Sequence, residues 1–492
     1  MYPWLLIGAV SVVVAYSFRG WVRTRLRLIK LAARMPGPPA WPLLGNALFF
    51  MATSADLLDV LSTAVKQYGE YVRFWVGPEL MVCVKNPADI RLLLTSNKIN
   101  IKGPFYEFMK VFIGPGVLSE GGPVWRNHRK IAHPSYSKKT VQRYATVFNS
   151  CAEDLVADLR KKNPDVTFNV YWDVVRFTTQ CVCQTIVGLS KEETGTVKSM
   201  DDILNETHNM YDFVFTNMTR WWLHIPVVYW LLGRKTTERY YLRLIDEMTS
   251  DMLARRRKAL SEKTLTEEEL GVVDRFILSG ELTDQEIKWE IMTFFTASQE
   301  ASAKIAAAAL LILAHLPEWQ EKVYNEIVEV LGEDGYVTGE DVRRLQCLDM
   351  VYKEAIRYMP IAAFIQRTVE EEITIKNGDI TLPAGVTVVI PIHPLHRDPK
   401  YWDEPDLVKP ERFLPENVRK RDPNAYVPFS LGAMDCIGRI FAESMIKIMV
   451  VHVVRHTRLV AAGSMEALPL HVAISVRSAH GYNLRAIPRG HS

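Results

Sequence analysis

The residue of this sequence with the clearest chemical potential is Cys436, which lies in a loop near the carboxyl end of the chain. The loop reads FSLGAMDCIG from Phe429 to Gly438. Gly432 and Gly438 permit backbone angles and close approaches that a side chain would forbid. A cysteine before a helix meets the positive end of the helix dipole, which favours the thiolate form. Such a thiolate is a good soft ligand for iron, although any lone cysteine before a helix shares part of this pattern.

Two helices are well marked in the sequence. One follows Cys436 and is expected to run from about Gly438 to Arg455. The other begins with a capping box of Thr283 and Glu286, runs through Phe295 and ends before Pro317. Because this second helix is apolar nearly all round, we expect it to be buried through the middle of the protein.

Strands are predicted in two short regions. Residues 71–84 alternate around a Gly-Pro turn, which predicts a β-hairpin, and residues 373–392 predict a second small sheet. Helices dominate the remainder, and no internal repeat or polar linker follows Asn46. The sequence therefore predicts a mainly α protein with small β-sheets (α+β) and one domain over residues 47–492.

The amino-terminal segment predicts the compartment. From Pro3 to Phe18 the chain is uncharged and mostly apolar, and basic residues follow at Arg19, Arg23, Arg25, Arg27, Lys30 and Arg34. A cleaved signal peptide would instead start with basic residues and end at small residues. Positive charge after the apolar run favours an uncleaved anchor with the body in the cytoplasm. We expect this anchor at residues 1–24 and a basic, proline-rich hinge at residues 25–46.

Charge and cysteine usage narrow the class of protein. The net charge is only +3, and no nucleic-acid-binding motif is present, so we expect no nucleic-acid partner. The six cysteines are scattered without a C-x-x-C pair, which favours neither a disulfide framework nor a structural zinc site. Apart from Cys436, we expect them to be buried free thiols.

Four motifs in order carry a family resemblance. The Cys436 loop resembles the haem-binding loop F-x-x-G-x-R-x-C-x-G of the cytochrome P450 superfamily. Trp125-x-x-x-Arg129, Glu354-x-x-Arg357 and Pro410-Glu411-Arg412-Phe413 resemble three further signatures of that superfamily. The sequence segments at 396–399, 412–417 and 425–430 are similar to those of cytochrome P450 family 4 and its insect relatives. The resemblance implies the cytochrome P450 fold and a microsomal haem-thiolate monooxygenase acting on fatty acids, related lipids or foreign lipophiles.

The resemblance also implies roles for individual residues. Cys436 would be the axial ligand of the iron in a non-covalently bound haem b, with Phe429 shielding the sulfur. The other haem-binding residues would be Trp125, Arg129 and Arg367 at the propionates, and Gly432 and Gly438 in the loop. A buried ion-pair cluster of structural importance would join Glu354, Arg357 and Arg412. The substrate pocket would include Phe295, Ala297 and Ala301.

Partners and location follow from the same resemblance. We expect electrons from NADPH through NADPH–cytochrome P450 reductase, which would dock on the basic residues Arg126, Lys130 and Arg439, with cytochrome b5 as a further donor. The protein is expected in the endoplasmic reticulum membrane with its catalytic domain on the cytoplasmic face. The substrate is expected to be a lipophilic small molecule.

Two departures from the family pattern keep other functions open. In the long helix, Glu300 supplies the expected acid, but Ala301 replaces the alcohol that normally helps to deliver protons, and Ser302 is the neighbouring candidate. In the loop, Met434 stands where an arginine is expected. One alternative is therefore a haem-thiolate isomerase or dehydratase that needs no O₂. The other alternative is a non-catalytic haem protein that binds hydrophobic ligands.

Overall fold

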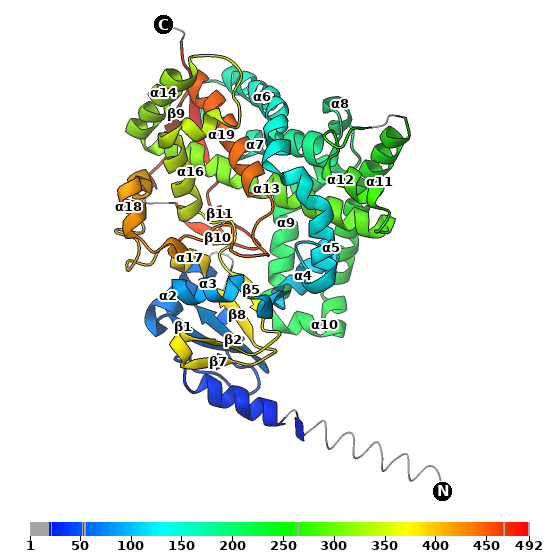
Figure 1. Cartoon of the computed structure of the whole chain (residues 1–492), viewed down its shortest axis with the longest axis vertical. Helices are drawn as coiled ribbons and strands as arrows, with labels where there is room; N and C mark the ends of the chain where they lie inside the picture. Colours follow the sequence, from blue (N-terminus) through cyan, green and yellow to red (C-terminus); the bar gives the residue numbers. More distant parts are fainter. Residues whose placement is uncertain are drawn as a thin grey trace.

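The structure is a computed structural model that describes residues 19–20, 22–51, 53, 56–262, 265–465 and 468–490. The apolar run on which the predicted anchor depends lies outside the described residues. The described chain is mainly helical with four small sheets, so the predicted fold class is confirmed. Figure 1 shows the largest sheet at the end of the molecule nearest the amino terminus, with most helices beyond it.

The helices differ widely in length. The longest are α6 (Lys138–Lys161), α9 (Met200–Thr219), α11 (Arg234–Glu262), α13 (Asp284–His315) and α19 (Arg439–His456). The others are α2 (Leu57–Tyr68), α3 (Pro87–Thr95), α4 (Phe105–Ile113), α5 (Gly122–Ala132), α7 (Tyr171–Val182), α8 (Lys191–Thr194), α10 (Pro226–Leu231), α12 (Val272–Ser279), α14 (Pro317–Leu331), α15 (Asp341–Arg344), α16 (Gln346–Tyr358), α17 (Ile392–Leu395) and α18 (Pro415–Lys420).

Helix α13 has the predicted capping box and burial. The Thr283 Oγ1 accepts from the Glu286 N–H at 3.3 Å, and the Glu286 carboxylate accepts from the Thr283 N–H at 2.8 Å. Among the described residues, α13 alone is long and apolar enough to cross a membrane. Since most of it is buried inside the protein, it is the central core helix that the sequence predicts.

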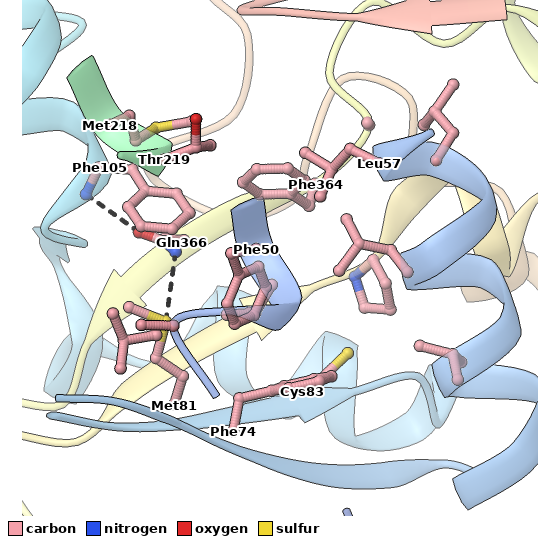
Figure 2. Close-up of a pocket in the computed structure, with 18 of the residues that line it drawn as sticks. Phe50, Leu57, Phe74, Met81, Cys83, Phe105, Met218, Thr219, Phe364 and Gln366 are labelled. Carbon is pink, nitrogen blue, oxygen red and sulfur yellow. Dashed lines mark hydrogen bonds between the residues drawn. The ribbon is translucent and has the colours of Figure 1, made fainter. Parts of the chain in front are cut away.

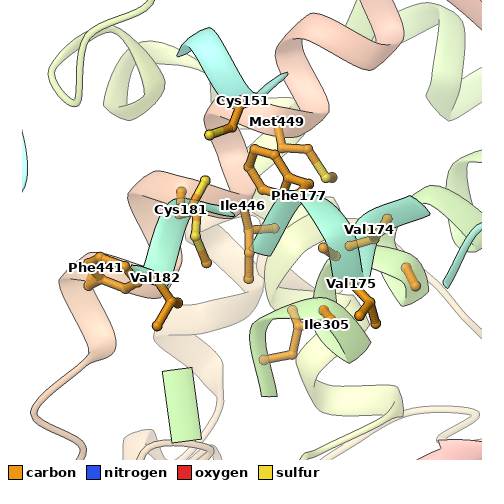
Figure 3. Packing of buried hydrophobic residues seen from close by; sticks show 14 of the residues in the cluster. Cys151, Val174, Val175, Phe177, Cys181, Val182, Ile305, Phe441, Ile446 and Met449 are labelled. Atoms are coloured by element: carbon orange, nitrogen blue, oxygen red, sulfur yellow. The ribbon is translucent and has the colours of Figure 1, made fainter. Parts of the chain in front are cut away.

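The hydrophobic core forms where α6, α7, α13 and α19 meet. Figure 3 shows Phe177 of α7 beside Met449 of α19, and Val175 of α7 beside Ile305 of α13. The expected free cysteines take part in packing: Cys83, Cys151, Cys181 and Cys183 are buried, while Cys347 is partly exposed. Thiols are small apolar groups in such an environment.

The largest sheet has the strand order β1-β2-β8-β5-β3. Its strands are β1 (Tyr71–Val76), β2 (Glu79–Val84), β3 (Ile101–Lys102), β5 (Ile365–Thr368) and β8 (Thr387–Ile390). The remaining strands are β4 (Phe168–Asn169), β6 (Ile373–Ile375), β7 (Ile380–Leu382), β9 (Thr457–Ala461), β10 (Leu470–Val472), β11 (Val476–Ser478) and β12 (Asn483–Pro488). The β1–β2 hairpin is confirmed.

The second predicted sheet is only partly correct. Strands β6 and β7 pair as a small hairpin, but β8 leaves it and pairs in parallel with β2. Hairpin signals in sequence are local, whereas the β2–β8 pairing joins distant segments that share a buried apolar face. Strand β8 in turn pairs antiparallel with β5, the strand that carries Arg367.

The predicted hinge is fixed to the body of the protein. Residues 22–32 are helical, and Leu31, Ala32 and Met35 are buried against the large sheet. Farther along, the Asn46 side chain donates to the Pro39 carbonyl at 2.8 Å and accepts from the Trp75 N–H at 2.9 Å. The segment therefore orients the domain as a docked element, not as a free spacer.

Candidate haem-thiolate site

The Cys436 loop is held by a sharp backbone turn. The Cys436 N–H donates to the Phe429 carbonyl at 2.9 Å, and Gly432 has a φ of 75°. A Cβ on Gly432 would lie 2.1 Å from the Leu94 carbonyl oxygen, so only glycine fits there. At Gly438, by contrast, a Cβ would meet Tyr136 at 3.7 Å, an ordinary contact. Helix α19 starts directly after Gly438, close to the predicted position.

The Cys436 thiol lies close to three basic side chains, those of Lys102, Arg129 and Arg439. Its residue keeps accessible surface, although surrounding protein desolvates the sulfur. Burial raises the pKa of Cys436, and Asp435 adds to this, while the Gly438 N–H, Arg129 and Arg439 oppose it. The helix dipole is therefore not enough to make the thiolate by itself, contrary to the sequence-based expectation. A metal that binds this sulfur would displace the proton.

Three cations lie near one another in this region, namely Lys102, Arg129 and Arg367. Lys102 of β3 and Arg367 of β5 are directly paired across the sheet. Arg367 is buried and donates only to the Gln366 carbonyl at 2.9 Å. The pKa of Lys102 lies well below its usual range because of burial and the neighbouring charges of Arg367 and Arg129, while Cys436 opposes that shift. Among the described residues, neither Lys102 nor Arg367 has an acidic partner.

Unpaired cations in a buried site call for an anion, because an isolated buried charge is costly. The two propionates of haem are such anions, and Cys436 offers sulfur to its iron. Lys102, Arg367 and Cys436 therefore fit haem. Sequence reasoning missed Lys102 because its pairing with Arg367 depends on a long-range strand contact, and no local motif marks it.

Arg129 has a different environment from the one its motif implies. Its guanidinium donates to the Asp435 carbonyl oxygen and to Asp435 Oδ1, both at 2.6 Å, and lies 5.8 Å from the Trp125 ring. Arg129 thus joins α5 to the Cys436 loop, and Trp125 is buried beside it. Met434 is buried where the family pattern has an arginine, so it brings no charge to this region.

The predicted structural cluster comes together in the core. Glu354 and Arg357 are fully buried, with two hydrogen bonds between them at 2.7 and 2.8 Å. Arg357 also donates to the carbonyls of His396, Pro405 and Leu407, and Arg412 Nε lies 3.5 Å from Glu354 Oε1. The cluster therefore ties α16 to the segment that precedes the haem loop.

A cavity lies beside α13. Ala297, Glu300 and Ala301 line it from one face of the helix. Ser302 is buried and is not part of this lining, and Phe295 packs in the hydrophobic core. Ala301 brings no hydroxyl to the cavity wall, as the sequence indicates.

Glu300 is held by two partners that the motif does not predict. Lys304, one helical turn along α13, forms a buried ion pair with Glu300 Oε1. The Ser475 hydroxyl, from the turn between β10 and β11, donates to the same oxygen at 3.2 Å. Desolvation lowers the pKa of Lys304, and Glu300 opposes that shift. Lys304 and Ser475 were both missed, although a lysine on an otherwise apolar helix was a visible signal.

A second apolar cavity lies between the large sheet, α2 and the end of α9. Figure 2 shows Phe50, Phe74 and Met81 on its walls. Phe105 and Phe364 line both cavities, and their ring centroids are 5.9 Å apart in an edge-to-face arrangement. This aromatic pair therefore stands where the two cavities adjoin.

The aromatic run at residues 209–230 divides between core and surface. Phe213 and Phe215 are buried, whereas Trp230 is 69% exposed. Exposed apolar side chains gather over the 3₁₀ helix Trp221–His224, α10 and the residues beside them: Trp221, Ile225, Val227, Trp230, Leu231 and Leu232. We call this set the α10 surface. Trp221 also lines the second cavity, so that cavity approaches the α10 surface.

Comparisons with known proteins agree with this geometry. A family model described as Cytochrome P450 matches residues 35–476. The chain is 28% identical to Probable cytochrome P450 4aa1 of Drosophila melanogaster, over 99% of this chain and 95% of that protein. It is 27% identical to Cytochrome P450 4V2 of Homo sapiens, over 97% of this chain and 92% of that protein.

Proposed function

Because this chain belongs to the cytochrome P450 family, we propose that it oxidises a lipophilic substrate with electrons delivered from NADPH by a reductase. Its general activity is that of a haem-thiolate monooxygenase, with non-covalently bound haem b. Haem supplies the activation of dioxygen and the insertion of one oxygen atom into the substrate. The observation that carries the proposal is the enclosed Cys436 thiol near Lys102 and Arg367, which have no acidic partner among the described residues.

We assign a role in binding haem, binding substrate or delivering protons to individual residues. Cys436 would hold the iron, and Lys102, Arg367 and Arg129 would hold the propionates. Glu354 would keep the loop in place through the buried cluster. The apolar cavity beside α13 would exclude bulk water and orient the substrate, and Glu300 and Ser302 stay the predicted residues for proton delivery.

The α10 surface supports a membrane location for the mouth of the second cavity. Trp and aliphatic side chains on one exposed face suit the interface of a bilayer. Together with the predicted anchor at residues 1–24, this surface would place the cavity where lipophilic substrates partition. We propose the cytoplasmic face of the endoplasmic reticulum membrane and docking of the reductase at the basic residues Arg126, Lys130 and Arg439.

A turnover assay tests the proposal. The full-length protein, purified reductase and NADPH are incubated with a panel of fatty acids, sterols and terpenoids, and oxygenated products are identified by mass spectrometry. Product that depends on both NADPH and reductase supports the proposal. Haem-containing protein that gives no product with any of these lipophiles contradicts it.

A haem-thiolate isomerase or dehydratase is the second candidate. It is favoured by Ala301, which offers no hydroxyl for proton delivery, and by the engagement of Glu300 with Lys304. Such an enzyme would consume lipid hydroperoxides without reductase or NADPH. The same purified protein, tested with hydroperoxides alone, separates the two candidates.

A further inference from the structure

A buried ion pair on the wall of an apolar cavity requires an explanation. Most residues that line the cavity beside α13 are apolar, including Met210, Val214 and Ile361. Glu300 lies on this wall, only 3% exposed and paired with Lys304. A buried ion pair of this kind is weak evidence for a stabilising role, because replacing such a pair with well-packed apolar residues often leaves the protein as stable or makes it more stable.

The ion pair is fixed from three elements. Lys304 contacts Glu300 Oε1 and the Ser475 hydroxyl, and its Nζ lies 5.6 Å from the Tyr211 ring of α9. The Ser475 hydroxyl in turn donates to Glu300 Oε1 at 3.2 Å. The hydrogen-bonding capacity of Lys304 and Ser475 is therefore directed at the cluster and not at the cavity.

One oxygen of the cluster stays open. Within the part of the chain that the structure describes, no residue donates a hydrogen bond to Glu300 Oε2. Because Glu300 lines the cavity, this carboxylate oxygen can accept a hydrogen bond from a ligand there. A carboxylate oxygen accepts but does not donate, so the ligand group must be a donor.

Charge decides which donor fits. Lys304 neutralises Glu300, and the nearby Arg477 is paired with Asp212 at 3.0 Å. A cationic amine would meet the charge of Lys304 without a free countercharge, and a carboxylate would face Glu300 Oε2. A neutral hydroxyl avoids both penalties.

We propose that the cavity binds a lipophilic alcohol whose hydroxyl group donates to Glu300 Oε2, with the Glu300–Lys304–Ser475 cluster fixing that acceptor. The apolar part of the substrate lies against the remaining cavity wall. This inference rests on the proposed function, since it names the substrate class of the same site.

Matched ligands test the inference. Dissociation constants of dodecan-1-ol, its methyl ether and dodecanoate are measured by equilibrium dialysis with the haem-loaded full-length protein in detergent, and the haem spectrum reports whether each ligand reaches the iron. A charge-assisted hydrogen bond predicts that the alcohol binds about 10- to 100-fold more tightly than the ether. A terpenoid alcohol and its methyl ether repeat the comparison with a branched chain.

Variants locate the acceptor. The double variant Glu300→Leu/Lys304→Met removes both charges together and is expected to abolish the preference for alcohols. Thr296→Val changes the same cavity wall one helical turn before Glu300 without altering the ion pair, and is the matched control, which is expected to keep the preference. Glu300→Gln retains size and is expected to give an intermediate preference.

The outcomes separate this inference from the proposed function. Equal binding of alcohol and ether, tighter binding of dodecanoate, or a preference that survives in the double variant would each overturn the inference. Reductase-dependent turnover of other lipophiles would then still support the proposed function. Failure of every alcohol in the set to bind would overturn the inference as well.

Discussion

Replacement of Lys102 with methionine is expected to weaken haem binding while it stabilises the protein without haem. In the free protein the ammonium lies near Arg367 and Arg129, which lower its pKa. Methionine removes this repulsion and keeps an apolar side chain near the Tyr106 ring, which is 5.1 Å from Lys102 Nζ. With haem bound, the ammonium would instead pair with a propionate, and methionine loses that contact.

The magnitude follows from the type of contact. A hydrogen bond between charged groups contributes about 1.5–3 kcal/mol, which would weaken haem binding about 10- to 150-fold. Part of this favourable free energy is offset, because the Lys102 amine must gain a proton in a site that lowers its pKa. We therefore expect a value near the lower limit, about tenfold.

The pH dependence has a definite sign. A propionate would raise the pKa of Lys102, so haem binding takes up a proton at every pH between the lowered pKa of the free protein and the raised pKa of the complex. The contribution of Lys102 to haem affinity is therefore complete below this window and is lost as the pH rises through it. The difference between wild type and Lys102→Met is expected to shrink with rising pH.

Haem transfer to an excess of apo-globin measures the effect, with the rate of loss followed in the Soret band at several pH values. Lys98→Met, which removes a partly exposed lysine four residues earlier in the chain, is the control and should lose haem at the wild-type rate. Thermal unfolding of the haem-free proteins tests the predicted stabilisation. Equal rates of haem loss for wild type and Lys102→Met at all pH values would refute the assignment of Lys102 to a propionate.

Four further changes test other parts of the site. Cys436→Ala is expected to abolish the reduced-CO absorption band of thiolate-ligated haem, and an unchanged band would remove Cys436 as the ligand. Glu354→Gln leaves a buried arginine unpaired and should cost about 3–5 kcal/mol in denaturant unfolding, whereas a cost below about 1 kcal/mol would contradict the cluster. Ala301→Thr should raise the coupling of NADPH use to product; no change there together with a silent Ser302→Ala would contradict the proton-delivery role. Deletion of residues 1–21 should release the protein only partly from membranes in sedimentation assays, and complete release would argue against a membrane role for the α10 surface.

The elements that sequence predicted well are those defined by local chemistry. The capping box before α13, the hairpin at residues 71–84 and the helix after Gly438 each depend on neighbouring residues alone. The turn conformation of Gly432, with a φ of 75°, is likewise a local feature. Such features can be predicted from the sequence because no distant residue is needed to form them.

The features that sequence did not predict all depend on long-range contacts. Strand β8 joins β2 in place of its local hairpin, and Lys102 lies beside Arg367 only because β3 pairs with β5. The thiol of Cys436 was expected to be acidic from the helix dipole, but burial raises its pKa instead. Desolvation depends on everything that packs around a group, so a local motif cannot report it.

These long-range contacts bear on the two departures from the family pattern. Met434 removes a cation from the loop, but Lys102 stands on the neighbouring strand to Arg367, and neither has an acidic partner among the described residues, so two unpaired positive groups remain near Cys436. Ala301 removes a hydroxyl from α13, but Glu300, Lys304 and Ser475 keep a polar cluster on the same cavity wall. Near Cys436, the charge lost within the motif is available from Lys102 outside it; on α13, the residues outside the motif instead fix Glu300, whose Oε2 stays open to the cavity. The motif positions alone would therefore understate what this site can bind, and Lys102→Met and Glu300→Leu/Lys304→Met examine the two replacements separately.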